Sequence, residues 1–415
     1  MMLDIHDAYL GLVDLSDMNP LHVKVRWFTQ GSVYVVEITS AFIRTDIECE
    51  SRLFQPKIVV ILQEENGCTD LGCITSGLMF AKDMFRKCRH EGHDNEHGTC
   101  PREIKSPLPS RTLFLRTVND DIRLFEPAPD RNDVAEYAAL SHCWGSGDHK
   151  PPQLTMQNES SFRTRIAWED LSPVFQDAIK VCRELDIKYL WIDSLCIRQD
   201  FKTDWEIESA RMAQYYEKAA VTLSVECSPD GGVSFLAARE SRWKPRRFTI
   251  VDPPGVARNF SVRAHFTSAD IPGSGLLPTR AWALQESFLS KRVIHFAPSD
   301  VWWRCGAKDV TEDGVNWETR LAKATPDCRV LRDTEDGPAN PEMHQLWWDI
   351  VQQYMRRDIT KLSDRLPGLS GLATRFHRTL NCRYLAGLWE DGLLNGLLWR
   401  LVSDSRDWWF GCPGK

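Results

Sequence analysis

Between residues 136 and 296 the chain alternates short apolar runs with longer amphipathic segments, and this alternation constrains the fold more than any other feature. The run EYAALSHCW (136–144), which ends at Gly145, has almost no polar–apolar alternation, as is typical of a strand buried on both faces. Three further runs are also predicted to be strands: YLWIDSLCI (189–197), VTLSVECS (221–228) and KRVIHF (291–296). Buried strands that alternate with amphipathic helices predict a parallel sheet with helices on both faces and right-handed crossovers. The predicted fold class is therefore α/β.

The helices between these runs carry capping signals. The first is predicted from Ser172 as N-cap, with Pro173 at the first helical position and apolar residues at helical spacing up to Leu185. A second helix is predicted with Asp204 as its cap, and a third over residues 280–290. In such sheets ligands bind at the carboxyl ends of the strands. The expected site therefore involves SHCWG (141–145), DSLCIRQD (193–200) and the segment leading into RAWALQE (280–286).

We expect three regions along the chain. Residues 1–105 are predicted to form a mixed N-terminal α+β region, residues 106–300 to contain the α/β core, and residues 301–415 to be mostly helical. A hairpin is predicted over residues 108–126, with Asn119-Asp120 in its turn. The stretch 232–278 is less regular and contains the short β-like runs RFTIVD and FSVRAHF.

Composition narrows the class of protein. The formal net charge of -7 argues against a general nucleic-acid or membrane-surface binder, because no basic face dominates. No apolar run approaches the roughly 20 residues of a membrane span, and the N-terminus lacks the basic start of a secretory signal. The 13 cysteines form no regular framework, which suits a reducing compartment. We therefore expect a cytoplasmic protein.

Four motifs in a fixed order resemble the fungal HET (heterokaryon incompatibility) domain: YAALSHCWG (137–145), WIDSLCIRQD (191–200), DW..E...M..YY..A (204–219) and RAWALQESFLSKRVIHF (280–296). The flanks are also similar to this family, so the resemblance covers roughly residues 85–400. It departs mildly at His142, where an aromatic residue is usual, and at Ala283, where a small hydroxyl residue is common. The resemblance implies a protein that induces cell death in heterokaryon incompatibility, as part of fungal innate immunity.

HET domains are in turn similar to TIR domains, and this second resemblance implies a flavodoxin-like strand order and an NAD site. Some TIR domains hydrolyse NAD with a glutamate on the helix after the third strand, in a Trp-Cys-x-x-Glu-like motif. Trp282 and Glu286 stand four residues apart in that topological position. The resemblance thus implies that Glu286 is catalytic, with NAD as substrate and no separate cofactor. The residues expected to bind NAD are Ser141, Trp144, Gly145, Asp193, Gln199 and Trp282.

The residue types suit that chemistry. Cleavage of the nicotinamide–ribose bond passes through an oxocarbenium-like state, which a carboxylate beside the ribose stabilises. The i, i+4 spacing puts Trp282 and Glu286 on one helix face, so a flat surface lies beside a carboxylate. Structural roles stay open: Glu286 is also placed to pair with Arg280 or Arg292, and Asp193 to cap its own turn. The segment SHCWG is equally open to interpretation as a packed strand end.

A non-enzymatic role is the main alternative. A TIR-like adaptor would signal by self-association with an empty sheet crevice, and in either case we expect a homo-oligomer and a protein partner that carries the non-self signal. A redox or phosphoryl-transfer protein is disfavoured, because the chain contains neither G-x-G-x-x-G nor G-x-x-x-x-G-K-[ST].

Three further features receive structural predictions. Cys88, His90, His93, His97 and Cys100 include enough soft ligands for zinc, but their spacing is irregular and their surroundings are polar. A solvated loop without metal is therefore expected there. Glu208 falls on the buried face of its helix and is expected to bond a buried partner. Cys196, flanked by apolar residues, is not expected to be a nucleophile.

Overall fold

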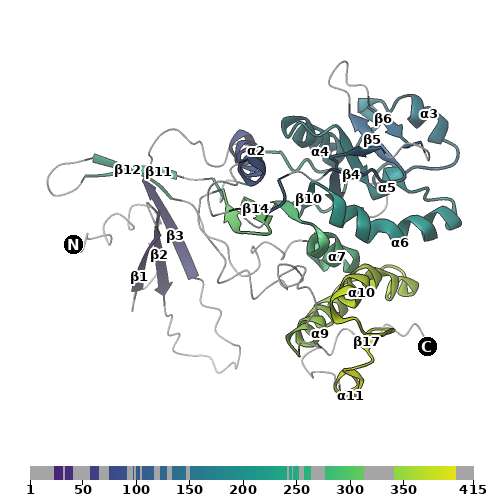
Figure 1. The fold of residues 1–415 in the computed structure, drawn as a ribbon. Helices are drawn as coiled ribbons and strands as arrows, with labels where there is room; N and C mark the ends of the chain where they lie inside the picture. The colour runs from purple at the N-terminus through teal and green to yellow at the C-terminus, as the bar shows by residue number, and fades with distance from the viewer. Residues whose placement is uncertain are drawn as a thin grey trace, which may run out of the picture.

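The computed structural model describes residues 23–30, 33–40, 57–64, 74–90, 97, 100–102, 105–115, 122–128, 133–145, 150–240, 243–244, 246–251, 257–262, 276–312 and 341–398. Figure 1 shows a central mixed sheet with helices around it, a second sheet formed by the N-terminal strands, and a helical C-terminal region. The α/β class predicted from the sequence is confirmed.

The central sheet has eight strands in the order β15-β14-β13-β10-β8-β9-β5-β6. Its four middle strands are parallel: β8 pairs with β9 and β10, and β10 pairs with β13. Every residue of β8, β10 and β13 is buried, and for β8 the absence of polar–apolar alternation predicted this. The bounds are β5 Thr112–Leu115, β6 Ile122–Phe125, β8 Ala138–Ser141, β9 Tyr189–Ile192, β10 Val221–Val225, β13 Arg292–Phe296, β14 Val301–Cys305 and β15 Asp309–Thr311.

Antiparallel strands extend this sheet at both edges, so it is mixed rather than wholly parallel. The predicted hairpin is present as β5 and β6, and β5 runs antiparallel to β9; the turn residues Asn119-Asp120 lie outside the described residues. At the other edge β14 pairs antiparallel with β13 and carries Trp302 and Trp303. The expectation that the chain is mostly helical from residue 301 is therefore wrong for residues 301–311. This VWWRC segment is short and rich in aromatic residues, and it completes a sheet edge that would otherwise be unpaired.

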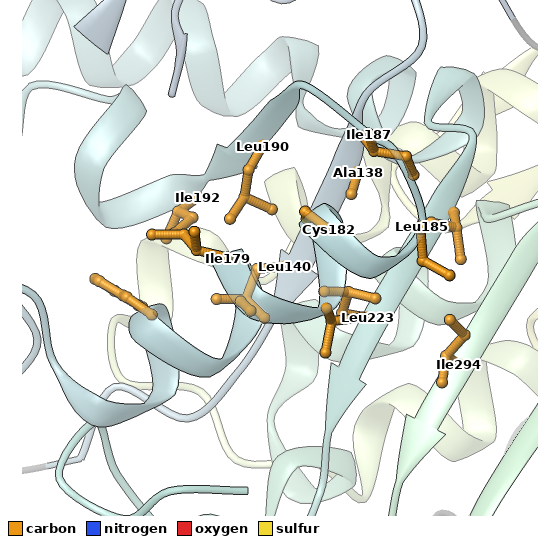
Figure 2. Close-up of a cluster of buried hydrophobic side chains, with 14 of the residues drawn as sticks. Ala138, Leu140, Ile179, Cys182, Leu185, Ile187, Leu190, Ile192, Leu223 and Ile294 are labelled. Atoms are coloured by element: carbon orange, nitrogen blue, oxygen red, sulfur yellow. The ribbon is translucent and has the colours of Figure 1, made fainter. Parts of the chain in front are cut away.

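Helix α4 (Pro173–Glu184) covers one face of the parallel strands. Its Ser172 cap is confirmed, because the Ser172 side chain accepts a hydrogen bond from the Phe175 backbone N–H at 3.4 Å. Figure 2 shows side chains of α4 and the following turn packed on those of the strands. The cluster is apolar on both sides of the contact, and it includes Ala138, Leu140, Ile179, Cys182, Leu185, Ile187, Leu190, Ile192, Leu223 and Ile294.

Helices α6 (Lys202–Lys218) and α7 (Ala281–Leu289) follow β9 and β10 and contact each other on the opposite face. The predicted Asp204 cap is wrong: α6 begins at Lys202 after Phe201. Asp204 instead accepts a hydrogen bond from the buried Arg111 at 2.5 Å. A buried guanidinium requires an acceptor, and this need outweighs capping. Shorter helices are α3 Glu159–Thr164, η3 Trp168–Asp170, α5 Asp193–Cys196 and η5 Leu277–Thr279.

The C-terminal helices cover α7 from outside (Figure 1). Helices α9 (Pro341–Met355) and α10 (Pro367–Leu380) share one apolar cluster with α7, in which Trp347 and Phe376 are fully buried. A methyl group at Gly371 would collide with that of Ala213 on α6, so the glycine permits close helix packing. The remaining elements here are η7 Leu362–Asp364, β16 Tyr384–Leu385, β17 Leu388–Trp389 and α11 Leu393–Gly396. Among the described helices, none is long and apolar enough to cross a membrane.

The second sheet joins two segments that are distant in the sequence. Its order is β1-β2-β3-β12-β11, so the hairpin from the irregular stretch 232–278 pairs with the N-terminal region. The sequence predicted a mixed N-terminal α+β region and the β-like runs RFTIVD and FSVRAHF, but it did not predict that these two parts of the chain pair. The bounds are β1 Val23–Gln30, β2 Val33–Ser40, β3 Lys57–Glu64, α2 Ile74–His90, β11 Arg246–Val251 and β12 Ala257–Val262; β4 Ser106–Pro107 pairs separately with β7 Val134–Ala135.

Candidate functional site

The candidate site lies where β8 and β9 end, beside helix α7. Ser141 is the last residue of β8, Asp193 directly follows β9, and Glu286 lies on α7. Because β8 and β9 are parallel, their carboxyl ends share one edge of the sheet. Helix α7 contacts both β8 and β10, which brings its Glu286 to this edge. The fold thus gathers residues that are far apart in the sequence.

Glu286 is 3% exposed and is hydrogen-bonded by the Ser141 hydroxyl, which donates to its Oε2. Burial raises the pKa of Glu286 to about 7; the nearby Arg280 charge opposes that shift, and the Asp193 charge adds to it. Hydrogen bonds from Ser141 and Tyr216 lower the pKa by smaller amounts. At neutral pH this carboxyl group therefore populates both protonation states, which suits either proton transfer or stabilisation of a nearby positive charge.

Asp193 joins the two strand-end loops. Its Oδ2 accepts a hydrogen bond from Trp144 Nε1 at 2.9 Å, and its Oδ1 accepts one from the Ser194 backbone N–H at 2.7 Å. Burial raises the pKa of Asp193, and the Arg280 charge opposes the shift. Gly145 adopts a left-handed conformation with φ 69 and is exposed, so the backbone turns away from the strand there. The structural role that the sequence left open for Asp193, a hydrogen bond from its side chain to the backbone of its own turn, is confirmed by the contact with Ser194.

Arg280 is the main group that the site prediction omitted. Its Nη1 donates to the His142 carbonyl oxygen, and its charge lowers the pKa of both Glu286 and Asp193. Its backbone is fixed from the C-terminal region, because the Ala281 N–H donates to the Asp358 carbonyl at 2.9 Å. Arg280 directly precedes AWALQES, and this position could have indicated a place in the site. From the sequence, Arg280 was considered only as a salt-bridge partner of Glu286.

The structural alternative for Glu286 does not hold in its expected form. Among the described residues no ion pair links Glu286 to Arg280 or Arg292 within 4.0 Å. Arg292 instead points to the other side of the sheet, where its Nε donates to Cys88 Sγ at 3.1 Å. Glu286 is therefore a buried carboxyl group bonded by hydroxyl groups, with a cation nearby but not in contact.

The two other predicted binding residues have packing contacts. Gln199 Nε2 donates to the Asp193 carbonyl at 3.2 Å and to the Ile197 carbonyl at 2.9 Å, so its amide nitrogen holds the loop. Trp282 is half-buried against an apolar cluster that includes Tyr216. Ser141, Trp144, Asp193 and Glu286 are thus the predicted residues that the structure brings together, whereas Gln199 serves the loop backbone.

A second polar group follows β10. Glu226 Oε1 lies 2.6 Å from His295 Nδ1, and the His295 ring stacks on Trp302 with centroids 3.6 Å apart. Burial lowers the pKa of His295 to about 4 and that of His142 to about 3, so both rings are neutral at neutral pH. Sequence reasoning missed Glu226 because VTLSVECS was interpreted only as a strand; its place just after a parallel strand was the available signal.

Two predicted structural roles are confirmed. Glu208 is 3% exposed and accepts hydrogen bonds at Oε2 from Ser110 at 2.5 Å and from Tyr215 at 2.8 Å. Cys196 is fully buried, and burial raises the pKa of its thiol to about 12. A thiol in that state is a poor nucleophile, so neither residue belongs to the candidate site.

Comparison with known proteins identifies the region that contains the site. The family model described as Heterokaryon incompatibility protein (HET) matches residues 137–286, from the residue before β8 to the glutamate on α7. A search of curated proteins and a search of solved structures each gave no match. The matched span contains every residue predicted to bind or cleave a ligand. The chain therefore carries a HET domain, the domain of heterokaryon incompatibility proteins, over residues 137–286.

Proposed function

We propose that this HET domain cleaves NAD at the nicotinamide–ribose bond, and that the resulting loss of cytoplasmic NAD causes cell death. The observation that carries the proposal is Glu286 itself. It is a buried carboxyl group with a pKa raised to about 7, bonded by Ser141 at the carboxyl edge of a parallel sheet. Carboxyl groups with pKa values shifted in this way are concentrated at functional sites.

The strand order supports a ligand site at this place. Numbered by their occurrence along the chain, the four parallel strands lie in the order second, first, third, fourth, as β9-β8-β10-β13. In doubly wound sheets of this order, ligands bind outside the carboxyl ends near the point where the order reverses, between the first and third strands. Glu286 bonds the end of β8, the first of these strands. The same order and the same helix position are expected from the resemblance to TIR domains.

The reaction requires little from the protein besides charge and position. The bond from ribose C1′ to nitrogen breaks, and its electron pair leaves with nicotinamide, which becomes neutral without a general acid. The Glu286 carboxylate stabilises the positive charge that develops on the ribose. Water then adds to C1′ and its proton passes to the carboxylate. Asp193 accepts a hydrogen bond from a ribose hydroxyl, and the indole of Trp144 offers a flat surface beside it.

The charges nearby fit an anionic dinucleotide. Arg280 lies close enough to lower the pKa of both carboxyl groups, so it provides positive charge for the diphosphate. Glu286 is only 3% exposed, so the site must open before NAD can reach this carboxyl group. The proposal therefore includes an activation step, for which self-association, prompted by a protein partner that carries the non-self signal, is the proposed trigger.

The same burial favours a second candidate function, an adaptor that signals through self-association without chemistry. The Glu286 carboxylate is bonded by Ser141 and lies beside Asp193 and Arg280. In an adaptor these residues would only hold α7 against the end of β8. An adaptor would bind other copies of the chain through the surface of the domain, and the buried residues of this cluster would take no part in signalling.

Nicotinamide release from NAD separates the two functions. The purified full chain is assayed over a series of protein concentrations, because self-association should increase the rate per molecule. Glu286→Gln should abolish release, whereas Glu208→Gln, which also alters a buried hydroxyl-bonded carboxylate, should retain it. Release that persists in Glu286→Gln would contradict the assignment of the residue. Toxicity on expression without any NAD loss would establish the adaptor function instead.

A further inference from the structure

Four potential metal ligands from three segments meet beside β14. Cys88 lies in the last turn of α2, His97 and Cys100 follow the helix, and Cys305 is the last residue of β14. One ligand atom from each residue lies within 4.8 Å of the others. The expected solvated loop is wrong for Cys88 and His97, which are 2% and 4% exposed. His93 and the side chain of His90 lie outside the described residues.

We propose that Cys88, His97, Cys100 and Cys305 bind one Zn²⁺ ion in a closed tetrahedral site. The observed spacing fits this geometry. Cys305 Sγ lies 3.6 Å from His97 Nδ1. Two ligands at tetrahedral angles, with bond lengths of about 2.3 Å for sulfur and 2.0 Å for nitrogen, are separated by about 3.5 Å. This pair thus lies at the separation that a central zinc ion requires, and all four ligand atoms lie within 4.8 Å of one another.

The donor set selects the metal and the role. Three thiolates and an imidazole form a Cys₃His set, which is one of the standard ligand sets of structural zinc and is too soft for magnesium or calcium. Four protein ligands fill the tetrahedron, so no position remains for water or substrate. Cys88, His97 and Cys305 are all buried, and Cys100 is partly buried. The site is therefore structural rather than catalytic.

A buried arginine provides a second, independent argument. Arg292 is 2% exposed, and no carboxylate among the described residues forms an ion pair with it. Its hydrogen bonds go to Cys88 Sγ at 3.1 Å, to the Ala220 carbonyl at 3.5 Å and to the Pro101 carbonyl. A buried guanidinium needs a compensating negative charge. Three thiolates around Zn²⁺ carry a net charge of -1, which balances Arg292, whereas three neutral thiols would leave its charge uncompensated.

The position of the site indicates what the metal holds together. Helix α2 contacts β14, and the ligands join the segment that includes α2 and Cys100 to the edge of the central sheet. On the same strand, Arg304 Nη2 donates to the Ser287 carbonyl at 2.6 Å, next to Glu286 on α7. Zinc at Cys305 would thus fix the segment before the HET domain to the strand that contacts the candidate catalytic helix.

The test starts from metal content and does not use enzymatic activity. The full chain, expressed with zinc and dialysed, should contain one zinc ion per chain by elemental mass spectrometry. Replacement of zinc by Co²⁺ should give the visible absorption bands of a tetrahedral cobalt–thiolate centre. A chain without zinc that also gives no cobalt spectrum would overturn the proposal. So would a disulfide between any two of Cys88, Cys100 and Cys305, shown by peptide mapping of protein kept under reducing conditions.

Variants connect the metal to these residues. Cys305→Ser should reduce the zinc content from one ion per chain to nearly none, whereas Cys227→Ser, a cysteine outside the cluster, should retain it. Arg292→Gln should weaken zinc affinity about 10- to 100-fold, as loss of a partner of a metal ligand does. Full zinc content in Cys305→Ser would overturn the assignment. If that variant fails to fold, the cobalt spectrum of the unmodified chain still decides.

Discussion

Two buried glutamates in this molecule have nearly the same polar partners and different charge surroundings. Glu208 is bonded by Ser110 and Tyr215, and Glu286 by Ser141, with Tyr216 close enough to lower the pKa of Glu286. The Glu208 carboxylate also contacts Arg211 Nη1 at 3.2 Å, at the protein surface. Glu286 has no such contact among the described residues, and burial raises its pKa to about 7. At Glu286 the hydroxyl donors and the nearby Arg280 charge therefore do not offset burial, and the two carboxyl groups differ in whether a cation contacts them.

Activity should show the largest contrast between the two glutamates. Glu286→Gln keeps the size of the side chain and removes its charge, so nicotinamide release should fall on the order of 10³-fold. Glu208→Gln should change it less than about tenfold, because that carboxylate supports helix packing away from the reacting bond. Initial rates at saturating NAD provide the measurement. Equal losses in the two variants would indicate that both act only through folding.

The second largest contrast between Glu286 and Glu208 variants should be in the pH dependence of the free energy of unfolding. The pKa of Glu286 is raised from 4.5 to about 7 in the folded chain, so the folded state binds more protons between these values. Its contribution to stability is fully present below about pH 4.5 and is lost as the pH rises through 7, a change of about 3 kcal/mol.

Urea unfolding at pH 5 and pH 7.5 measures this effect. The free energy of unfolding of Glu286→Gln relative to the unmodified chain should increase by that amount across the interval. His142 and His295, whose pKa values are lowered, act in the opposite direction in both proteins and therefore cancel in the difference. A flat difference between Glu286→Gln and the unmodified chain would show that the Glu286 pKa is not raised.

At a single pH, the free energy of unfolding should rank the two variants in the opposite order from activity: Glu208→Gln should be the more destabilised. Glu208→Gln places an amide NH₂ where Oε1 receives Arg211, and should cost about 1–3 kcal/mol at pH 7.5. Glu286→Gln should cost nothing or be stabilising at this pH, because it removes a charge that burial disfavours. The midpoints of urea unfolding curves measure both. If Glu286→Gln proves the more destabilising, the charge surroundings of the two glutamates do not differ in the way proposed.

Local patterns predicted much of this fold, and long-range pairings limited the rest. Short strand-like runs separated by amphipathic helices predicted the parallel strands, and Ser172 with Pro173 predicted the start of α4. Asp204 failed as a cap because Arg111, far away in the sequence, binds its carboxylate. Cys305 was not associated with Cys88 for the same reason: pairing of β14 with β13 brings it there, and no local pattern encodes that pairing.

The candidate site shows the same limit at the level of side chains. Sheet topology predicted that Ser141, Asp193 and Glu286 would meet, because parallel strand ends share an edge. It did not predict whether a cation would contact the carboxylate. That depends on Arg280, whose backbone is fixed by Asp358 from the C-terminal helical region. The chemical character of Glu286 is thus set partly by residues outside the HET domain.

The smallest expected effect comes from the two serines, and it tests whether they are equivalent. Ser141→Ala removes a donor that lowers the pKa of Glu286, so the pH midpoint for ionisation of this group should move upward, and nicotinamide release at pH 7 should fall. Ser110→Ala removes one of three partners of Glu208 and should cost about 1 kcal/mol of stability without moving that midpoint. The pH–rate profile of nicotinamide release and urea unfolding, measured on both variants, separate the two effects. An unchanged midpoint in Ser141→Ala would mean that burial and Arg280 alone set the pKa of Glu286, and that the strand-end hydroxyl only fixes the position of the carboxylate.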